Sequence, residues 1–89
     1  MPFEFDEKKS AANLEKHNID FQEAQGLWKD LKRFVMAARI GDESRGLLIG
    51  KLRGKHWTAV CTMRGPNTRV ISVRRARPNE VELYEQNDR

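Results

Sequence analysis

The spacing of apolar residues changes near Lys32, from that of helices to that of strands. Before this point they recur three or four residues apart on one helical stripe: Phe21, Ala24, Leu27, Trp28 and Leu31. After it come four strand-like runs separated by short turns that contain glycine, at residues 34–40, 45–52, 56–64 and 68–75. Turns this short join antiparallel neighbours, whereas parallel strands need long crossovers. The chain is therefore predicted to be an α+β protein, with a helical layer on one face of a four-stranded antiparallel meander.

Capping residues define two helices in the first third of the chain. Asp6 is a suitable N-cap for a helix that ends at His17, and Asn18 can adopt the left-handed conformation that follows a helix. Residues 20–23 have the D-x-x-E pattern of a capping box. This pattern predicts a second helix from Phe21 to about Lys29.

Two short elements complete the predicted fold. Phe3-Glu4-Phe5 alternates like a short edge strand, and Pro78 fits the first turn of a closing helix with acidic residues near its N-terminus. No internal repeat, low-complexity tract or linker interrupts the sequence. Residues 1–89 are therefore predicted to form one domain.

The charged residues fall into three blocks along the chain. Residues 1–31 carry a net charge of −3 and residues 78–89 carry −3, whereas residues 32–77 hold twelve basic and two acidic residues, a net charge of +10. Nine of the twelve cations are arginine, whose planar fork suits bidentate contact with phosphate. The central block therefore predicts binding to a polyanion, most simply nucleic acid. The alternative is a solvated sheet face that carries arginine for solubility.

Several classes of protein are excluded by composition. The single cysteine, Cys61, cannot form an internal disulfide, and together with two histidines at no ligand spacing it predicts no metal site. The glycines make neither a Walker loop nor a dinucleotide-binding loop, so no cofactor is expected. No apolar run approaches the length of a membrane span, and the acidic, aromatic start is unlike a signal peptide. The expected compartment is the reducing cytoplasm.

Alternation along the last two strands predicts which face of the sheet is open. In the third strand one face is apolar, with Trp57, Ala59, Cys61 and Met63, and the other carries His56, Thr58, Val60, Thr62 and Arg64. In the fourth strand Ile71 and Val73 point inward, and Val70, Ser72 and Arg74 point outward. This register places Arg69 and Arg75 on the apolar face. A β-bulge would reverse it.

Two groups of residues have the chemistry needed to cleave RNA without a metal, a reaction that takes a base for the 2′-hydroxyl and an acid for the leaving oxygen. His17, next to Lys16 at a helix end, is either this acid/base or a residue that caps the last carbonyls. Five arginines, Arg45, Arg64, Arg69, Arg74 and Arg75, are candidates to bind phosphate or to stabilise the extra charge of the transition state.

The sequence resembles the BrnT family of toxins over nearly its whole length. The N-terminal part of the resemblance consists of Phe5-Asp6, Lys9, Asn13, Lys16-His17, Phe21 and Glu23-Ala24. The downstream part consists of Arg45 followed by Gly50, the segment Arg69-Val70-Ile71-Ser72-Val73-Arg74-Arg75-Ala76, and then Glu80 and Tyr84. Asn18 stands where the family usually has glycine, a substitution that a left-handed position tolerates.

This resemblance implies a RelE/ParE-like fold and a toxin of a type II toxin–antitoxin system. It implies a BrnA-type antitoxin that dimerises, binds operator DNA and holds the toxin in a complex, expected to be a heterotetramer, that represses its own operon. It carries over Lys16, His17, Arg45, Ser72 and Arg74 as site candidates.

The resulting hypothesis is a metal-independent endoribonuclease that inhibits translation and growth. His17 activates the 2′-hydroxyl, Arg74 and Arg45 bind the scissile phosphate, and a 2′,3′-cyclic phosphate is left. Lys16 holds a flanking phosphate, Ser72 orients one oxygen, and Arg64, Arg69 and Arg75 contact the backbone. Two alternatives stay open: a non-enzymatic inhibitor of DNA gyrase, as in the ParE branch of the fold, and a plain nucleic-acid-binding module.

Overall fold

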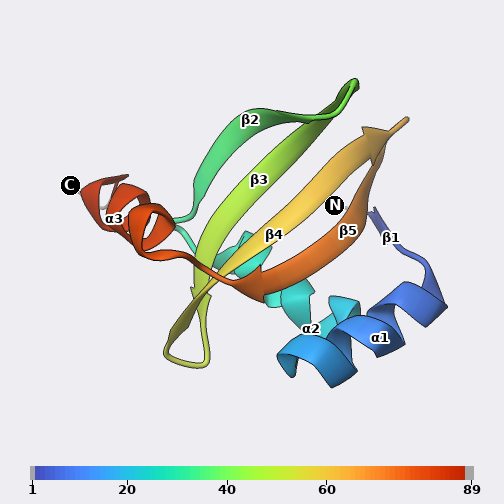
Figure 1. Cartoon of the computed structure of the whole chain (residues 1–89), viewed down its shortest axis with the longest axis horizontal. Helices are drawn as coiled ribbons and strands as arrows, with labels where there is room; N and C mark the ends of the chain where they lie inside the picture. Colours follow the sequence, from blue (N-terminus) through green and yellow to red (C-terminus); the bar gives the residue numbers. More distant parts are fainter. Residues whose placement is uncertain (1, 88–89) are drawn as a thin grey trace.

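A mixed five-stranded sheet with helices against both of its faces makes up the computed structural model, which describes residues 2–87 (Figure 1). The elements in chain order are β1 (Phe3–Glu4), α1 (Glu7–His17), α2 (Phe21–Ala24), the 3-10 helix η1 (Gln25–Lys29), β2 (Phe34–Ile40), β3 (Glu43–Leu52), β4 (Lys55–Arg64), β5 (Asn67–Arg75) and α3 (Pro78–Asn87). The predicted α+β fold, with its order of strands and helices, is confirmed.

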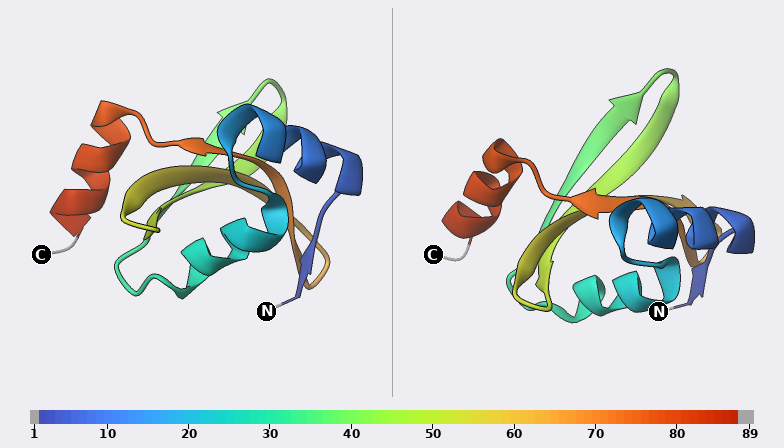
Figure 2. Two further views of the ribbon diagram at one scale, coloured as in Figure 1. Left: turned by 90° about the horizontal axis from the view of Figure 1, so that it is seen from below. Right: turned by 60° about the horizontal axis from the view of Figure 1, so that its bottom comes forward.

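The sheet has the strand order β1-β5-β4-β3-β2. Strands β2 to β5 form the predicted antiparallel meander, and β1 adds to β5 in parallel at the far edge. The β2–β3 hairpin extends away from the helical layer, so that its turn lies far from α1, α2 and η1 (Figure 2). No helix within the described residues is long and apolar enough to cross a membrane.

The N-terminal helices begin and end at the residues that the sequence predicts. The Asp6 carboxylate accepts hydrogen bonds from the backbone N–H groups of Lys8 and Lys9, at 2.8 and 3.2 Å, and Asp20 accepts one from Glu23 N–H at 2.7 Å. Asn18 ends α1 in the left-handed conformation, with φ of 65°.

The second predicted helix is found over residues 21–29, but it is not α-helical throughout. Only Phe21–Ala24 is α-helical, and Gln25–Lys29 tightens into a 3-10 helix. Tighter winding points Leu27 fully into the core and brings Gly26 against β3, where an added Cβ would lie 3.1 Å from a methyl group of Leu52. Packing against the sheet therefore overrides the α-helical pattern in this segment.

The core lies between the sheet and the α2–η1 segment. Ile19, Phe21, Ala24 and Leu27 pack against sheet residues that share one face: Leu48, Trp57, Ala59, Val70 and Val73. We call this the helix-side face of the sheet.

A β-bulge in β5 changes the predicted faces of that strand. Val60 pairs with Ser72 but Cys61 pairs with Val70, so Ile71 is an extra residue with no partner in β4. Val70, predicted to point outward, is instead buried in the core. Arg69, predicted to lie on the apolar face, is moved by the same bulge to the opposite face. The predicted faces of β4 are confirmed.

The face opposite the helix-side face is partly covered, whereas the sequence predicted a helical layer on one face only. Glu80 at the start of α3 reaches Thr58 on this side of β4. Ile49, in register with Thr58, is fully buried here. We call this the open face, because α3 borders it and leaves most of β5 and the β2–β3 hairpin uncovered.

Candidate functional site

Five of the predicted site residues lie on the open face of the sheet. Arg74 pairs with Thr58, and Ser72 pairs with Val60 two residues along. Arg69, beyond the bulge, pairs with Thr62, and alternation along β4 adds Arg64. On β3, Arg45 shares the face of Ile49, which pairs with Thr58. Residues from three strands that are far apart in sequence therefore form one cationic surface.

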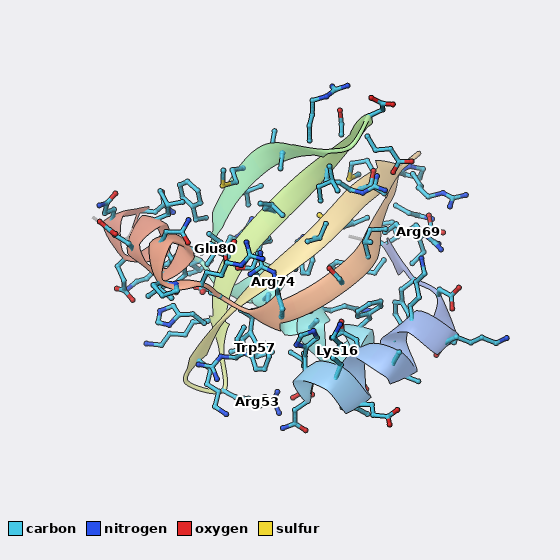
Figure 3. The ribbon with its side chains drawn as sticks, viewed as in Figure 1. Lys16, Arg53, Trp57, Arg69, Arg74 and Glu80 are labelled. Atoms are coloured by element: carbon cyan, nitrogen blue, oxygen red, sulfur yellow. The ribbon has the colours of Figure 1, made fainter. Side chains whose placement is uncertain are left out.

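Arg74 is held by Glu80 through a two-point ion pair (Figure 3). Its Nη1 and Nη2 donate to the two carboxylate oxygens at 2.8 and 2.9 Å. Glu80 Oε1 also accepts hydrogen bonds from the Thr58 hydroxyl at 2.9 Å and from the backbone N–H of Arg77 at 2.8 Å. The guanidinium of Arg74 is thus fixed in orientation over the sheet.

The electrostatics of the pair match this geometry. Glu80 is 7% exposed. The pKa of Glu80 is lowered to about 2, chiefly by the hydrogen bond from Arg74 and also by the bonds from Arg77 and Thr58, against the opposing effect of burial. The same carboxylate raises the pKa of Arg74. Both groups are therefore charged over the whole physiological range.

From the sequence, Glu80 is a possible proton acceptor, and capping of the closing helix is the simpler role. It has this role, because its carboxylate accepts the N–H of Arg77 at the start of α3. The sequence analysis does not predict the pairing of Glu80 with Arg74. The sequence signal for this pairing is weak: the two residues are six positions apart, with the end of a strand and a proline between them.

Arg45 lies at the opposite end of the open face from Arg74. Along β3, Arg45 is four residues from Ile49. Ile49 pairs with Thr58 of β4, and Thr58 pairs in turn with Arg74 of β5. At the usual spacings of a sheet, the two Cα atoms are about 16 Å apart. Arg45 forms an ion pair with Glu43. The structure therefore does not bring Arg45 and Arg74 together at one point.

Arg64 and Arg69 form a corner of the open face next to β1. Both face the carboxylate of Glu4, at 3.8 Å from Arg64 Nε and 3.5 Å from Arg69 Nη1. These distances are longer than those of the Arg74–Glu80 pair. The two guanidiniums are consequently only loosely held by Glu4.

Lys16 and His17 lie at the edge of β5 rather than on the open face. The side-chain amide of Asn13 donates to the carbonyl of Val73 at 2.9 Å and accepts from the N–H of Val73 at 3.2 Å. It thus makes the two hydrogen bonds that a neighbouring strand would make to Val73. This fixes α1 along the edge of β5. His17, one turn further, lies about 6 Å beyond Asn13 toward the C-terminal end of that strand. Its ring makes no hydrogen bond to the helix-end carbonyls within residues 2–87.

Arg75 lies on the helix-side face, as predicted, at the last position of β5. Its guanidinium lies over the ring of Trp57, with Cζ 5.5 Å from the ring centroid, and Arg53 lies at the same distance. Arg53 also forms an ion pair with Glu23, with Nε 3.0 Å from Oε2. Arg53 was not a predicted site residue, and its position depends on the buried Trp57. Figure 3 shows Arg53, Trp57 and Lys16 near the same end of the sheet.

The structure thus places the candidate residues in two neighbouring groups. One is the open face, with Arg45, Arg64, Arg69, Ser72 and Arg74. The other, which we call the edge cluster, consists of Lys16, His17, Arg53 and Arg75. The two groups meet at the C-terminal end of β5, where Arg74 and Arg75 are adjacent.

Comparison with known proteins gives one result for the family. A search of curated proteins finds no match to the sequence. The family model described as "Ribonuclease toxin, BrnT, of type II toxin-antitoxin system" matches residues 5–80. The match runs from the residue before the N-cap of α1 to Glu80, and so contains every candidate residue of both groups. The chain belongs to the BrnT family of ribonuclease toxins, whose members act in type II toxin–antitoxin systems with an RNA substrate and a cognate antitoxin.

Proposed function

We propose that the protein is a metal-independent endoribonuclease that cleaves RNA lying across the open face and leaves a 2′,3′-cyclic phosphate. The observation that supports this is the gathering of Arg45, Arg64, Arg69, Ser72 and Arg74 on one side of the sheet. Arginines on a rigid surface at several separate points suit the repeating charge of a nucleic-acid backbone.

The scissile phosphate lies at the C-terminal end of β5 in this proposal. Arg74 binds its non-bridging oxygens and stabilises the charge that develops on them, and Ser72 donates a hydrogen bond to one oxygen. His17, at the neighbouring edge, removes the proton from the 2′-hydroxyl. The 2′-oxygen then attacks phosphorus, the bond from phosphorus to the 5′-oxygen breaks, and the leaving oxygen takes up a proton.

The other cations bind phosphates away from the point of cleavage. Lys16 and Arg75 flank the scissile phosphate, and Arg64 and Arg69 bind the backbone at the β1 corner. Arg45 binds a phosphate at the far end of the open face, because its distance from Arg74 prevents both from serving one phosphate. Glu80 is a positioning residue, since it acts only by holding Arg74.

Cleavage of a defined RNA by the purified protein in EDTA tests this function. We expect fragments with cyclic phosphate ends. Arg74→Lys, which keeps a cation beside Glu80 but loses the two-point geometry, is expected to lower the cleavage rate by about 100-fold or more. Arg39→Lys, on the helix-side face of β2, is the matched control. Intact RNA in the presence of folded protein, or full activity of Arg74→Lys, would contradict the proposal; intact RNA would favour an inhibitor of the gyrase type.

In the cell, we propose, a BrnA-type antitoxin neutralises the protein in the cytoplasm. The antitoxin dimerises and binds operator DNA, and the heterotetramer of two toxins and two antitoxins represses its own operon. Addition of the cognate antitoxin to the cleavage reaction is expected to stop it.

A further inference from the structure

Strand β2 is an apolar edge of the sheet. It is last in the strand order and pairs only with β3. Val35 is 61% exposed, Ile40 is 55% exposed, and Arg39 is the only charged residue in the strand. Natural proteins usually protect such an edge with charges, proline or a covering segment, because its free backbone groups can pair with another strand. The edge is therefore suited to receive a strand from a partner.

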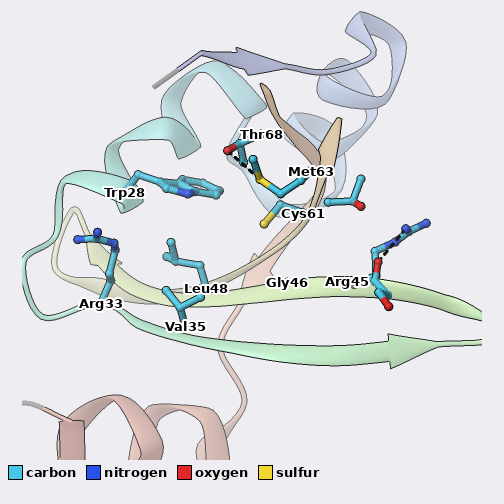
Figure 4. Close-up of a pocket in the computed structure, with 11 residues that line it drawn as sticks. Trp28, Arg33, Val35, Arg45, Gly46, Leu48, Cys61, Met63 and Thr68 are labelled. Atoms are coloured by element: carbon cyan, nitrogen blue, oxygen red, sulfur yellow. Dashed lines mark hydrogen bonds between the residues drawn. The ribbon is translucent and has the colours of Figure 1, made fainter. Parts of the chain in front are cut away.

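An apolar groove lies beside this edge on the helix side of the hairpin (Figure 4). It has a volume of about 590 Å³ and lies between η1 and the ends of β3 and β4. Its apolar lining consists of Trp28, Val35, Leu48, Cys61 and Met63. Arg33 and Arg45 lie at its opposite ends.

The other side of the edge is apolar as well. Met36 and Ile40 lie on the open face, with Leu47 in register with Met36. Because successive side chains of a strand point to opposite faces, a strand added to β2 would insert every second side chain toward the groove and lay the others against Met36 and Ile40. Both sets of side chains would thus find apolar surface.

The charges around the hairpin indicate the kind of partner. Lys32, Arg33, Arg39 and Arg45 outnumber Asp42 and Glu43 in this region. A second copy of the chain paired at β2 would bring these cations together, and like charges across a strand pair are destabilising. A segment with apolar residues and acidic flanks would complement both the surface and the charge.

We infer that β2 and the groove beside it are the docking site for an extended segment of the cognate antitoxin, apolar with acidic flanks, which adds to the sheet as a sixth strand. The inference rests on the proposed function, in which the partner is the antitoxin. The added strand lies beside β2, which separates it from Arg45 of β3. The side chains that it lays against Met36 and Ile40 border the open face at the Arg45 end, so they also obstruct the path of RNA there. Docking at this place therefore accounts for neutralisation without contact with His17.

Binding of the purified cognate antitoxin to single variants tests this site. Val35→Glu and Met63→Glu change side chains that are largely exposed in the free toxin, at 61% and 63%, so the fold should be retained. We expect each to weaken antitoxin binding by about 100-fold or more, because each places a buried carboxylate in the interface. Leu14→Glu, at a half-exposed apolar position on α1, is the matched control and should bind as the wild type does.

Hydrogen exchange measures the addition of the strand. The amides of β2 should exchange more slowly in the complex than in the free toxin. Wild-type affinity of Val35→Glu, or unchanged exchange in β2, would overturn the inference. Dimerisation of the free toxin that Val35→Glu abolishes would assign the edge to a second copy and would equally overturn it. Binding is measured without RNA, so a failure of docking is distinguishable from an absence of ribonuclease activity. The same variants should keep ribonuclease activity when no antitoxin is present.

Discussion

At the scale of single residues, one ion pair links the fold to the proposed chemistry. Arg74 supplies a cation to the open face, and Glu80 fixes that cation while it caps α3. A free arginine on a strand would sample many rotamers, and each contact with phosphate would require ordering it. The pair removes most of this cost before RNA binds. The same arrangement makes Arg74 necessary to the fold, because its loss would leave a buried carboxylate without its partner.

Glu80→Gln should lower both stability and activity. The amide keeps the volume of the carboxylate but loses the ionic bonds to Arg74, so we expect a loss of about 2–3 kcal/mol in the free energy of unfolding. Cleavage should also slow, because Arg74 is no longer held. Glu85→Gln is the control, since Glu85 is exposed and its partner among residues 2–87 is the half-buried His56. Urea unfolding and cleavage rates check both expectations, and a variant as stable as the control would refute them.

The same carboxylate should make the protein sensitive to acid. The pKa of Glu80 is about 2 in the folded state and 4.5 in the reference state. A lowered pKa stabilises the fold above the unfolded value, and this contribution disappears as pH falls from about 4.5 to 2, by about 3 kcal/mol at most.

Asp30 titrates in the same direction, so the comparison must be made between variants. Unfolding of the wild type and of Glu80→Gln should be measured at pH 6 and pH 3. We expect the wild type to lose more stability than Glu80→Gln over this interval. Equal losses would show that Glu80 does not carry the effect.

At the scale of elements, the sequence predicts what is local and misses what depends on distant contacts. The caps at Asp6, Asn18 and Asp20 and the glycine turns act within a few residues, so their patterns are readable. The bulge at Ile71 is different, because it is determined by how β5 packs against β4 and the core. Without knowledge of this bulge, the sequence assigns Arg69 to the wrong face of the sheet. The distance between Arg45 and Arg74 likewise follows only from the strand register.

Asn13 is the clearest case of an element held by one side chain. Its amide bonds to the carbonyl of Ile19 as well as to both backbone groups of Val73. Asn13→Leu would leave these buried groups unpaired and should cost about 2–4 kcal/mol of stability. Hydrogen exchange at Val73 should also become faster. Glu15→Leu, at an exposed position of the same helix, is the control, and equal exchange at Val73 in both variants would contradict this role.

At the scale of the whole molecule, the acidic and basic blocks of the sequence become separate regions of the fold. The acidic N-terminal block forms β1, the helices and η1, and the acidic end forms α3, whereas the basic centre forms the sheet. Four arginines are thereby presented on the open face, and Lys16, Arg53 and Arg75 lie in the edge cluster. Repulsion within this surface is offset at Glu4, Glu23 and Glu80, each of which pairs with an arginine.

Binding of single-stranded RNA should therefore depend strongly on salt. Each phosphate that is neutralised contributes a slope of about −0.7 in the logarithm of affinity against the logarithm of salt concentration. Arg64→Ala should make the measured slope less steep by about this amount, whereas Arg39→Ala should not change it. Fluorescence anisotropy with an RNA that has a 2′-deoxy residue at the cleavage point measures binding without cleavage. An unchanged slope for Arg64→Ala would remove Arg64 from the RNA path.

The dependence of the N-terminal elements on β5 has a consequence for the order of synthesis. β1 pairs with β5, and α1 is fixed to β5 through Asn13, so the beginning of the chain lacks these partners until residues 67–75 have been made. Ser72, Arg74 and the position of His17 all arrive with that strand. Without that strand the proposed site is incomplete, so we expect an unfinished chain to be unable to cleave RNA. On the proposed function, activity should therefore appear only once β5 has been made and has folded, and an antitoxin already present can bind the toxin at that point.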